Sequence, residues 1–319
     1  MNPGDSSRYI KSTARKLGFD LCGIARAEPI GRADYFAAWL AHGSAGSMNY
    51  LHRNVAERTD PRRLLDGARS VVVVALLYNQ SPPDQPRDPS APRGRVAAYA
   101  WGDDYHEVVK KKLFALADQM HEDLPPPFET KVCVDTAPLL ERELAAAAGV
   151  GWLAKNTMIL HPQLGSFFFL GEIVTTLELT PDEPLEDHCG TCTACLDACP
   201  TDAFTAPHQM DASRCISYLT IEHRGSISKP FQEMMGDWVF GCDVCQDVCP
   251  FNRDAPHTRE ARFAVRNPGA RPDLGRLLSW SSADHRRELR GSAIKRANPE
   301  MLLRNARIAL DNVQQSQQP

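Results

Sequence analysis

The residues in this 319-residue sequence that offer the clearest chemistry are its cysteines, eight of which lie between residues 189 and 249 out of ten in all. One run, CGTCTACLDACP, begins at Cys189, and a second, CDVCQDVCP, begins at Cys242. Thiolates at such short spacing can hold a soft metal centre, whereas in an oxidising compartment they would form disulfides. Both runs end in Cys-Pro, and this repeated pattern helps to decide between a metal centre and disulfides.

The spacing C-x2-C-x2-C-x3-C-P is that of bacterial ferredoxins, in which the fourth cysteine ligates the other of two [4Fe-4S] clusters. The second run has Val239 at one ligand position, and the separate Cys215 is available to replace it. The crossed pattern assigns one cluster to Cys189, Cys192, Cys195 and Cys249, and the other to Cys199, Cys215, Cys242 and Cys245. Structural zinc favours two separated C-x2-C pairs, so we prefer two clusters to zinc or disulfides.

Asp135 is the main candidate for acid–base chemistry. It ends a segment from Lys131 that alternates as a strand, and a helix is predicted from Thr136 to Ala148. A helix dipole at that point would favour the ionised carboxylate, and burial would oppose ionisation. The structural alternative is that Asp135 or Thr136 caps the helix, with Pro138 in the first turn.

The predicted elements around these residues give an α+β fold. Helices are predicted over residues 7–17 and 35–41 and in a segment ending at 121, and strands over 19–25, 70–78, 158–161 and 173–179. A helix over 210–222 would carry Cys215 under the clusters, and a helix pair is predicted over 290–310, before a polar tail without a fold. The expected domains are 1–180 (catalytic), 181–255 (ferredoxin-like) and 256–319 (helical, with a disordered end).

The charge distribution singles out the C-terminal segment. Residues 253–319 hold 13 Lys and Arg against 7 Asp and Glu, although the whole chain has a formal charge of −4. Such a segment fits a polyanion or, as the alternative, a solvated helical face. No apolar stretch reaches the ~18 residues of a membrane span, and the N-terminus lacks a signal peptide's apolar region. Cysteines at ligand spacing fit a reducing compartment, so a soluble cytoplasmic protein is expected.

Over residues 7–310 the chain resembles the epoxyqueuosine reductase family. The resemblance rests on YAWGDDYH from residue 99, VDTAPLLER from 134, GWLAKN from 151, residues 165–172, RCISYLTIE from 214, GCDVCQDVCPFN from 241 and RGSA from 290. It implies a nitroreductase-like cobalamin-binding domain, also related to reductive dehalogenases, and a short HEAT-like C-terminal segment. It further implies that cobalamin binds without a lower histidine ligand, and the sequence has no D-x-H-x-x-G motif.

The reaction implied by the resemblance removes the epoxide oxygen of epoxyqueuosine at the wobble position of a tRNA. Two clusters would pass electrons from an external flavodoxin or ferredoxin type of carrier to cobalamin, and Asp135 would donate a proton, with its pKa raised by burial beside the corrin. A monomer is expected. The alternatives are a reductive dehalogenase-like enzyme acting on a small molecule and a two-cluster electron carrier.

Further site residues follow from the same resemblance. The polar side arms of the corrin would meet Arg58, Tyr99, Lys155, Asn156 and Ser217, together with Asp135, while Gln246 and Asp247 would face either the corrin or solvent. The candidates for tRNA phosphate contacts are Arg286, Arg287, Arg290, Lys295 and Arg296. The wobble base would be flipped out of its stack and read in the pocket.

Overall fold

The computed structural model describes residues 1–81 and 91–316 of the chain. Its helices are α1 (Pro3–Lys16), α2 (Ala33–Ala41), α3 (Val55–Thr59), α4 (Tyr105–Asp123), α5 (Glu141–Ala147), α6 (Ala194–Asp197), α7 (Ile216–Ile221), α8 (Lys229–Met234), α9 (Val244–Asp247), α10 (Leu274–Leu278), α11 (Ser282–Glu288) and α12 (Pro299–Ser316). Its strands are β1 (Leu21–Arg26), β2 (Ser70–Leu77), β3 (Arg95–Val96), β4 (Thr130–Cys133), β5 (Trp152–Leu153), β6 (Ile159–Leu160), β7 (Phe168–Thr175), β8 (Phe204–Ala206), β9 (Gln209–Met210) and β10 (Trp238–Phe240).

The N-terminal part is built on a four-stranded antiparallel sheet in the order β1-β2-β7-β4. The central strand β2 is buried along its whole length, which is the position expected for a continuous apolar, β-branched run. Its neighbour β7 carries Glu172 at mid-strand, where it lies between Val73 of β2 and Cys133 of β4. An acidic residue therefore occupies the middle of an otherwise apolar sheet.

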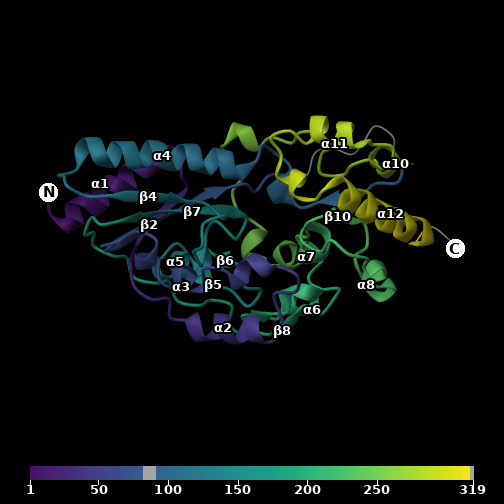
Figure 1. The fold of residues 1–319 in the computed structure, drawn as a ribbon, viewed down its shortest axis with the longest axis horizontal. Coiled ribbons are helices and arrows are strands. Elements are labelled where there is room, and N and C mark those ends of the chain that lie inside the picture. Colours follow the sequence, from purple (N-terminus) through teal and green to yellow (C-terminus); the bar gives the residue numbers. More distant parts are fainter. Residues whose placement is uncertain (82–90, 317–319) are drawn as a thin grey trace.

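Helices cover both faces of this sheet, and alternate residues of each strand serve opposite faces. On one face, Val72 and Ile173 join the core formed with α1 and α4, and on the other, Val73 and Val174 pack with Leu144 of α5. Figure 1 shows α1 and α4 together along one side of the sheet and α5 on its other side. The loop between β4 and α5, which carries Asp135, therefore lies at the end of this layered structure.

The cysteine segment consists of short elements, α6 to α9 with the β8–β9 hairpin. Strand β10 joins it to the N-terminal part by pairing in parallel with β3. The C-terminal helices α10 to α12 lie beside it, at the end of the molecule opposite the N-terminus (Figure 1). No helix in the described ranges is both long enough and apolar enough to cross a membrane.

Helix α12 attaches to the cysteine segment through polar side chains that bind its backbone. The fully buried Asn305 donates through Nδ2 to the carbonyl oxygens of Thr220 and Val239, each at 2.9 Å. The neighbouring Arg304 donates to three further carbonyl oxygens, those of Leu219, His223 and Gly225. Because buried carbonyls need hydrogen-bond partners, α12 is part of the packing of this segment.

Three element predictions are wrong in detail. The helix after Asp135 begins at Glu141 rather than at Thr136, because a residue that precedes a proline, here Ala137, is disfavoured in helical geometry. Residues 210–222 do not form one helix, since Cys215 adopts an extended backbone between a 3-10 turn and α7. The chain end is helical to Ser316, because α12 continues to pack through Val313 and Asn312, whose Nδ2 donates to two backbone carbonyls.

Candidate active site and cluster centres

The eight clustered cysteines influence one another electrostatically within the two groups of the crossed assignment, which itself stays a prediction. In the first group, burial and then the charges of Cys189 and Cys249 raise the pKa of the Cys195 thiol to about 11. Burial also raises the pKa of Cys249, and the charge of Cys192 adds to this rise. In the second group, burial raises the pKa of Cys242, and the thiolates of Cys215 and Cys199 raise it further. Burial likewise raises the pKa of Cys245, with Cys215 and Cys242 as its next neighbours. Metal ligation would have to lower these pKa values, as it does for coordinating thiols.

The first group lies nearer the surface. It surrounds a cavity of about 120 Å³ lined by Cys189, Cys192, Cys195 and Cys249 with Lys155, Asn156 and Phe251 among its other residues, and Cys192 is exposed. Trp152 donates through Nε1 to the Cys189 sulfur at 3.4 Å. In the second group, Cys215 and Cys242 pack against a core that also contacts Tyr99. The second group is thus next to Tyr99, one of the predicted corrin contacts, while Lys155 and Asn156 line the cavity of the first group.

Asp135 lies in a chain of charged groups that sequence reasoning did not foresee. Its Oδ2 is 2.9 Å from Nε2 of His106, and Nδ1 of the same ring is 2.7 Å from Oδ1 of Asp104. The other carboxylate oxygen of Asp104 accepts from Nζ of Lys295 at 2.7 Å. Asp104 caps α4, and the ring of Tyr105 stacks on the His106 ring with centroids 4.1 Å apart. The start of α4 therefore holds His106 against Asp135.

The electrostatics of these linked charged groups contradict the expected raised pKa of Asp135. Burial alone would raise it, but the hydrogen bond and charge of His106 outweigh burial and lower the pKa of Asp135. Burial alone would lower the pKa of His106, yet its hydrogen bonds to Asp104 and Asp135 raise it to about 9. At neutral pH the transferable proton therefore resides on His106, between two carboxylates.

This ion pair predicts a pH-dependent stability. Because the pKa of His106 is raised from 6.5 to about 9 on folding, its stabilising contribution is complete below about 6.5 and is lost as the pH rises through about 9. We expect the urea midpoint of the wild-type protein to fall over this range, and to fall much less in His106→Gln. The control His121→Gln changes a histidine of the same helix that hydrogen bonds the hydroxyl of Thr130 rather than a carboxylate, and it should keep the wild-type loss. An unchanged alkaline loss in His106→Gln would contradict the assignment.

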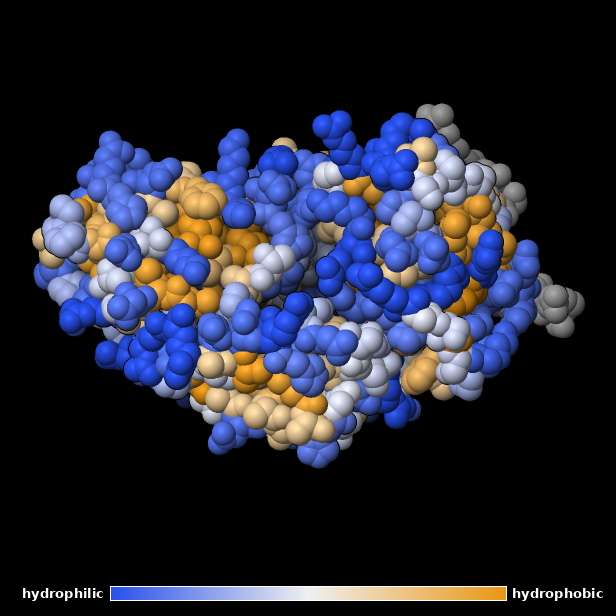
Figure 2. Space-filling view, viewed as in Figure 1, coloured by the Kyte–Doolittle hydropathy of each residue, from blue (hydrophilic) through white to orange (hydrophobic). Residues whose placement is uncertain are grey.

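Polar groups from distant segments surround the exposed side of Asp135, whose side chain is 51% accessible. Arg296 forms an ion pair with Glu222 at 2.8 Å and lies 5.8 Å from the ring centre of Tyr50. The charges of Asp135, Glu222, Arg296 and Arg58 all act on the Tyr50 hydroxyl, whose pKa burial raises to about 12. Burial also raises the pKa of Tyr99, with Asp135 as its strongest charged neighbour. Figure 2 shows a hollow near the middle of one face, bordered by hydrophilic residues.

The predicted corrin contacts divide into two sets. Arg58, Tyr99 and Asp135 belong to the polar surroundings just described. The others face the cysteine loops: Lys155 donates to the carbonyl oxygens of Gly190 and Cys192, Asn156 to that of Cys245, and Ser217 hydrogen bonds the Cys215 thiol, while Gln246 accepts from Ser166 and Asp247 is exposed. Contact of Lys155, Asn156 and Ser217 with a corrin stays a prediction.

The five basic residues predicted to contact tRNA are also divided. Arg286 and Arg290 are exposed, and Arg287 is exposed but paired with Asp284 and Glu288. Lys295 and Arg296 instead bind Asp104 and Glu222 within the protein. Part of the basic charge of this segment therefore serves the site around Asp135.

The small-residue loop Gly43–Tyr50 approaches a side chain rather than providing a plain turn. Gly46 has a φ of +57°, and a Cβ placed there would lie 2.6 Å from the Tyr218 ring. The Tyr218 hydroxyl bonds both N and Oγ of Ser47, at 2.7 and 2.8 Å. Because Tyr218 lies in α7, three residues after Cys215, this loop packs against the helix that follows that cysteine.

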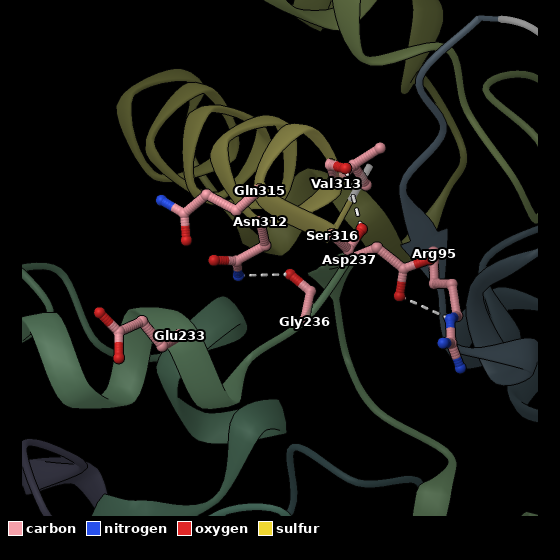
Figure 3. Close-up of a pocket in the computed structure, with 8 residues that line it drawn as sticks. All are labelled: Arg95, Glu233, Gly236, Asp237, Asn312, Val313, Gln315 and Ser316. Carbon is pink, nitrogen blue, oxygen red and sulfur yellow. Dashed lines mark hydrogen bonds and ion pairs between the residues drawn. The ribbon is translucent and has the colours of Figure 1, made fainter. Parts of the chain in front are cut away.

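A larger cavity, of about 440 Å³, lies between α8, the start of β10 and the end of α12. Figure 3 shows Asn312 directed at the Gly236 carbonyl and Arg95 directed at Asp237. None of the clustered cysteines lines it, nor does any group around Asp135. We therefore place the candidate active site at Asp135 and not in this cavity.

Comparisons with known proteins agree with this geometry. A model of a 4Fe-4S double cluster binding domain matches residues 188–252, so the chain is a two-cluster iron–sulfur protein. A second model, epoxyqueuosine reductase QueG, DUF1730, matches residues 58–136. The epoxyqueuosine reductase of Xanthomonas campestris pv. campestris is 40% identical over 313 residues, which cover 98% of this chain and 88% of that protein. The chain belongs to the epoxyqueuosine reductase family, and it is an oxidoreductase.

Solved structures agree with the family and the mixed α/β fold. An epoxyqueuosine reductase crystallised with an epoxyqueuosine-modified tRNA-Tyr stem loop has a TM-score of 0.91 and 33% identity, covering 96% of this chain and 81% of that one. The Bacillus subtilis enzyme, described with its catalytic aspartate loop swung out of the active site, has a TM-score of 0.89 and 32% identity, with the same coverage. A catabolic reductive dehalogenase, at 16% identity and a TM-score of 0.51, shares the fold.

Proposed function

We propose that this chain reduces epoxyqueuosine in tRNA to queuosine. The reaction takes two electrons and two protons, breaks both C–O bonds of the epoxide, and leaves an alkene and water. The observation that carries the proposal is the position of a proton-bearing pair, His106 and Asp135, among groups that also adjoin the second cysteine group. A proton donor and an electron path are the two requirements of this reduction.

The residues around Asp135 fit a cobalamin. Tyr50, Arg58, Tyr99 and Arg296 offer hydrogen-bond donors for the amide arms of a corrin, and Glu222 offers an acceptor. His106 has both ring nitrogens engaged by carboxylates, so it is not free to serve as a lower ligand. When bound, cobalamin supplies a low-potential reductant that no side chain provides.

The protein residues then have defined tasks. Asp135 delivers a proton to the epoxide oxygen, and His106 returns a proton to Asp135, as a positioned acid–base pair does. Asp104 fixes the orientation of the His106 ring and Lys295 holds Asp104. The ion pair of Arg296 with Glu222 orients the arginine at the edge of the site.

Electrons would enter through the first cluster and leave through the second. The exposed Cys192 belongs to the first group, and Cys242 of the second packs in the core that contacts Tyr99. The charge of the Cys195 thiolate raises the pKa of the Cys245 thiol, and this proximity supports two adjacent clusters. A soluble flavodoxin or ferredoxin type of donor would suit this route, and we propose that the chain acts in the cytoplasm as a monomer with the domains predicted above, including a nitroreductase-like N-terminal domain and a HEAT-like end.

The loop that carries Asp135 is proposed to move during the catalytic cycle. The Bacillus subtilis relative has been described with its catalytic aspartate loop swung out of the active site. Here residues 134–140 form an irregular connection between β4 and α5, and irregular connections need fewer contacts to be broken than helices or strands. An outward position would admit the substrate, and an inward position would bring Asp135 to it.

The tRNA contact can be tested through its salt dependence. A relative binds an epoxyqueuosine-modified tRNA stem loop, and Arg290 of this chain is exposed and follows α11. If Arg290 contacts a phosphate, Arg290→Ala should weaken binding and lower the slope of log K against log salt by about 1. The matched control is Arg8→Ala, an exposed arginine of α1, at the other end of the molecule. Equal slopes for Arg290→Ala and the wild type would contradict the contact.

The proposed reaction is tested by anaerobic turnover of epoxyqueuosine-containing tRNA. The protein, with both clusters reconstituted, is assayed under a strong reductant with and without added cobalamin. Formation of queuosine only with cobalamin is the expected result. If no product forms with clusters and cobalamin both bound, the substrate assignment is wrong, and a dehalogenase-like reaction on a small molecule is tested next.

A further inference from the structure

Two acidic residues behind Asp135, Glu141 and Glu172, have no task in the reaction described above. Glu172 has no solvent-accessible surface and lies at the middle of β7, opposite Cys133 and Val73. Neither of its carboxyl oxygens meets a partner of hydrogen-bond geometry among the described residues. A carboxyl group in this position is costly unless it is neutral or paired, which calls for an explanation.

The two carboxyls lie next to each other and cannot both be ionised. Burial raises the pKa of Glu172 well above its ordinary value, and the Glu141 carboxylate raises it further. Burial raises the pKa of Glu141 to about 7, and the charge of Asp135 adds to this rise, although the hydrogen bond from the Asp135 amide opposes it. The other titratable or charged groups facing the pair are Arg142, Cys133 and Tyr105. The buried Glu172 therefore keeps its proton, and Glu141 changes its charge around neutral pH.

Glu141 connects this pair to the backbone of Asp135. Its Oε1 accepts the amide N–H of Asp135, although the two residues are separated by an irregular loop. Asp135 has a φ of +49°, a conformation that is strained for any residue with a side chain. The amide of Thr136 also donates back to the carbonyl of Val134. The strained turn that presents the Asp135 side chain to His106 is thus held at its amide by a carboxylate.

We propose that Glu141 is a positioning residue that latches the loop of residues 134–140 in its inward position, through the hydrogen bond that its carboxyl oxygen accepts from the Asp135 amide. The hydrogen bond of Asp135 to an anionic acceptor is stronger than one to a neutral acceptor. Protonation of Glu141 weakens the bond and releases the loop. This inference rests on the proposed role of Asp135 as proton donor, and it explains the buried Glu172.

The latch is tested with Glu141→Ala and Glu141→Gln, and with Glu143→Ala as the matched control. Glu143 is in the same helix but pairs with Arg32 at 3.7 Å. The first readout is amide hydrogen exchange of residues 134–140 in the purified protein. We expect faster exchange in Glu141→Ala, an intermediate rate in Glu141→Gln, which keeps an acceptor oxygen, and the wild-type rate in the control. Exchange in β2 reports whether each variant is folded.

The second readout is single-turnover kinetics with the modified tRNA stem loop between pH 5 and 9. For Glu141→Ala we expect a fall in kcat of about 100-fold, as for a small displacement of a catalytic group, with an unchanged KM. Glu141→Gln should lose less and should lack the decline of kcat at acid pH that the wild type shows. Glu172→Leu should move that decline to higher pH, because an apolar side chain beside Glu141 makes the ionised form of Glu141 less favourable.

Wild-type exchange and kcat in a folded Glu141→Ala would overturn the latch. So would a decline at acid pH that persists in Glu141→Gln. Failure of the wild-type protein to turn over would overturn the proposed reaction instead, and the hydrogen-exchange result would still decide whether Glu141 holds the loop.

Discussion

Replacing Asp135 with asparagine should reduce queuosine formation by about 10²–10⁴-fold, the range typical of a lost general acid. Asparagine has nearly the same shape, but its amide cannot take a proton from His106 and pass it to the epoxide oxygen. Iron content and tRNA affinity should stay at the wild-type level, because Asp135 is outside both cysteine groups and outside α11. The measurement is single-turnover product formation with the clusters reconstituted and cobalamin added.

The control for this substitution is Asp118→Asn, which changes an exposed aspartate of α4. It should retain full activity. His106→Gln should lose activity in the same direction as Asp135→Asn, because it removes the group that holds the proton at neutral pH. Undiminished turnover by Asp135→Asn would show that the proton comes from another group, and the proposed mechanism would be wrong.

Replacing Cys245 with serine should abolish turnover and remove about half of the iron and acid-labile sulfide, since one of two four-iron clusters is lost. Cys245 belongs to the second cysteine group, which in the proposed route passes electrons from the first cluster towards Asp135. Electrons would then stop at the first cluster. Iron analysis and electron paramagnetic resonance of the reduced protein would measure the loss.

Cys22→Ala provides the comparison, because Cys22 lies in β1 outside both groups. It should keep the full iron content and activity. A Cys245→Ser protein with all of its iron would contradict the assignment of this ligand, and one with half of the iron but full activity would contradict the electron route.

The presence of two clusters could be predicted from the sequence, because ligand spacing is a local property and a double-cluster domain model matches the same residues. The assignment of each cysteine, including Cys215, to one cluster stays a prediction. The expected helix around Cys215 was wrong, because the Asp211 side chain accepts from the Ser213 amide and forms a short turn before the cysteine. The ligand prediction did not depend on that helix.

The surroundings of Asp135 could be predicted only in part. The end of a strand identified Asp135 itself, but its partner His106 is 29 residues earlier in the chain, and only the packing of α4 on the sheet brings them together. Without this partner, only a helix dipole and burial could be weighed for the pKa of Asp135, and the charge of His106, which lowers that pKa, was missing. The basic residues Lys295 and Arg296 were identified by charge, yet their acidic partners come from segments that no local pattern connects to them.

The attachment of α12 has a consequence for the order in which the protein matures. Asn305 and Arg304 satisfy carbonyl oxygens of residues 219–225 and of Val239, and they are synthesised only after all eight cysteines. On the ribosome, the cysteine loops therefore emerge before the helix that completes their packing. We expect iron–sulfur cluster insertion to be completed after α12 has been released, so the cell must protect eight reduced thiols during that interval.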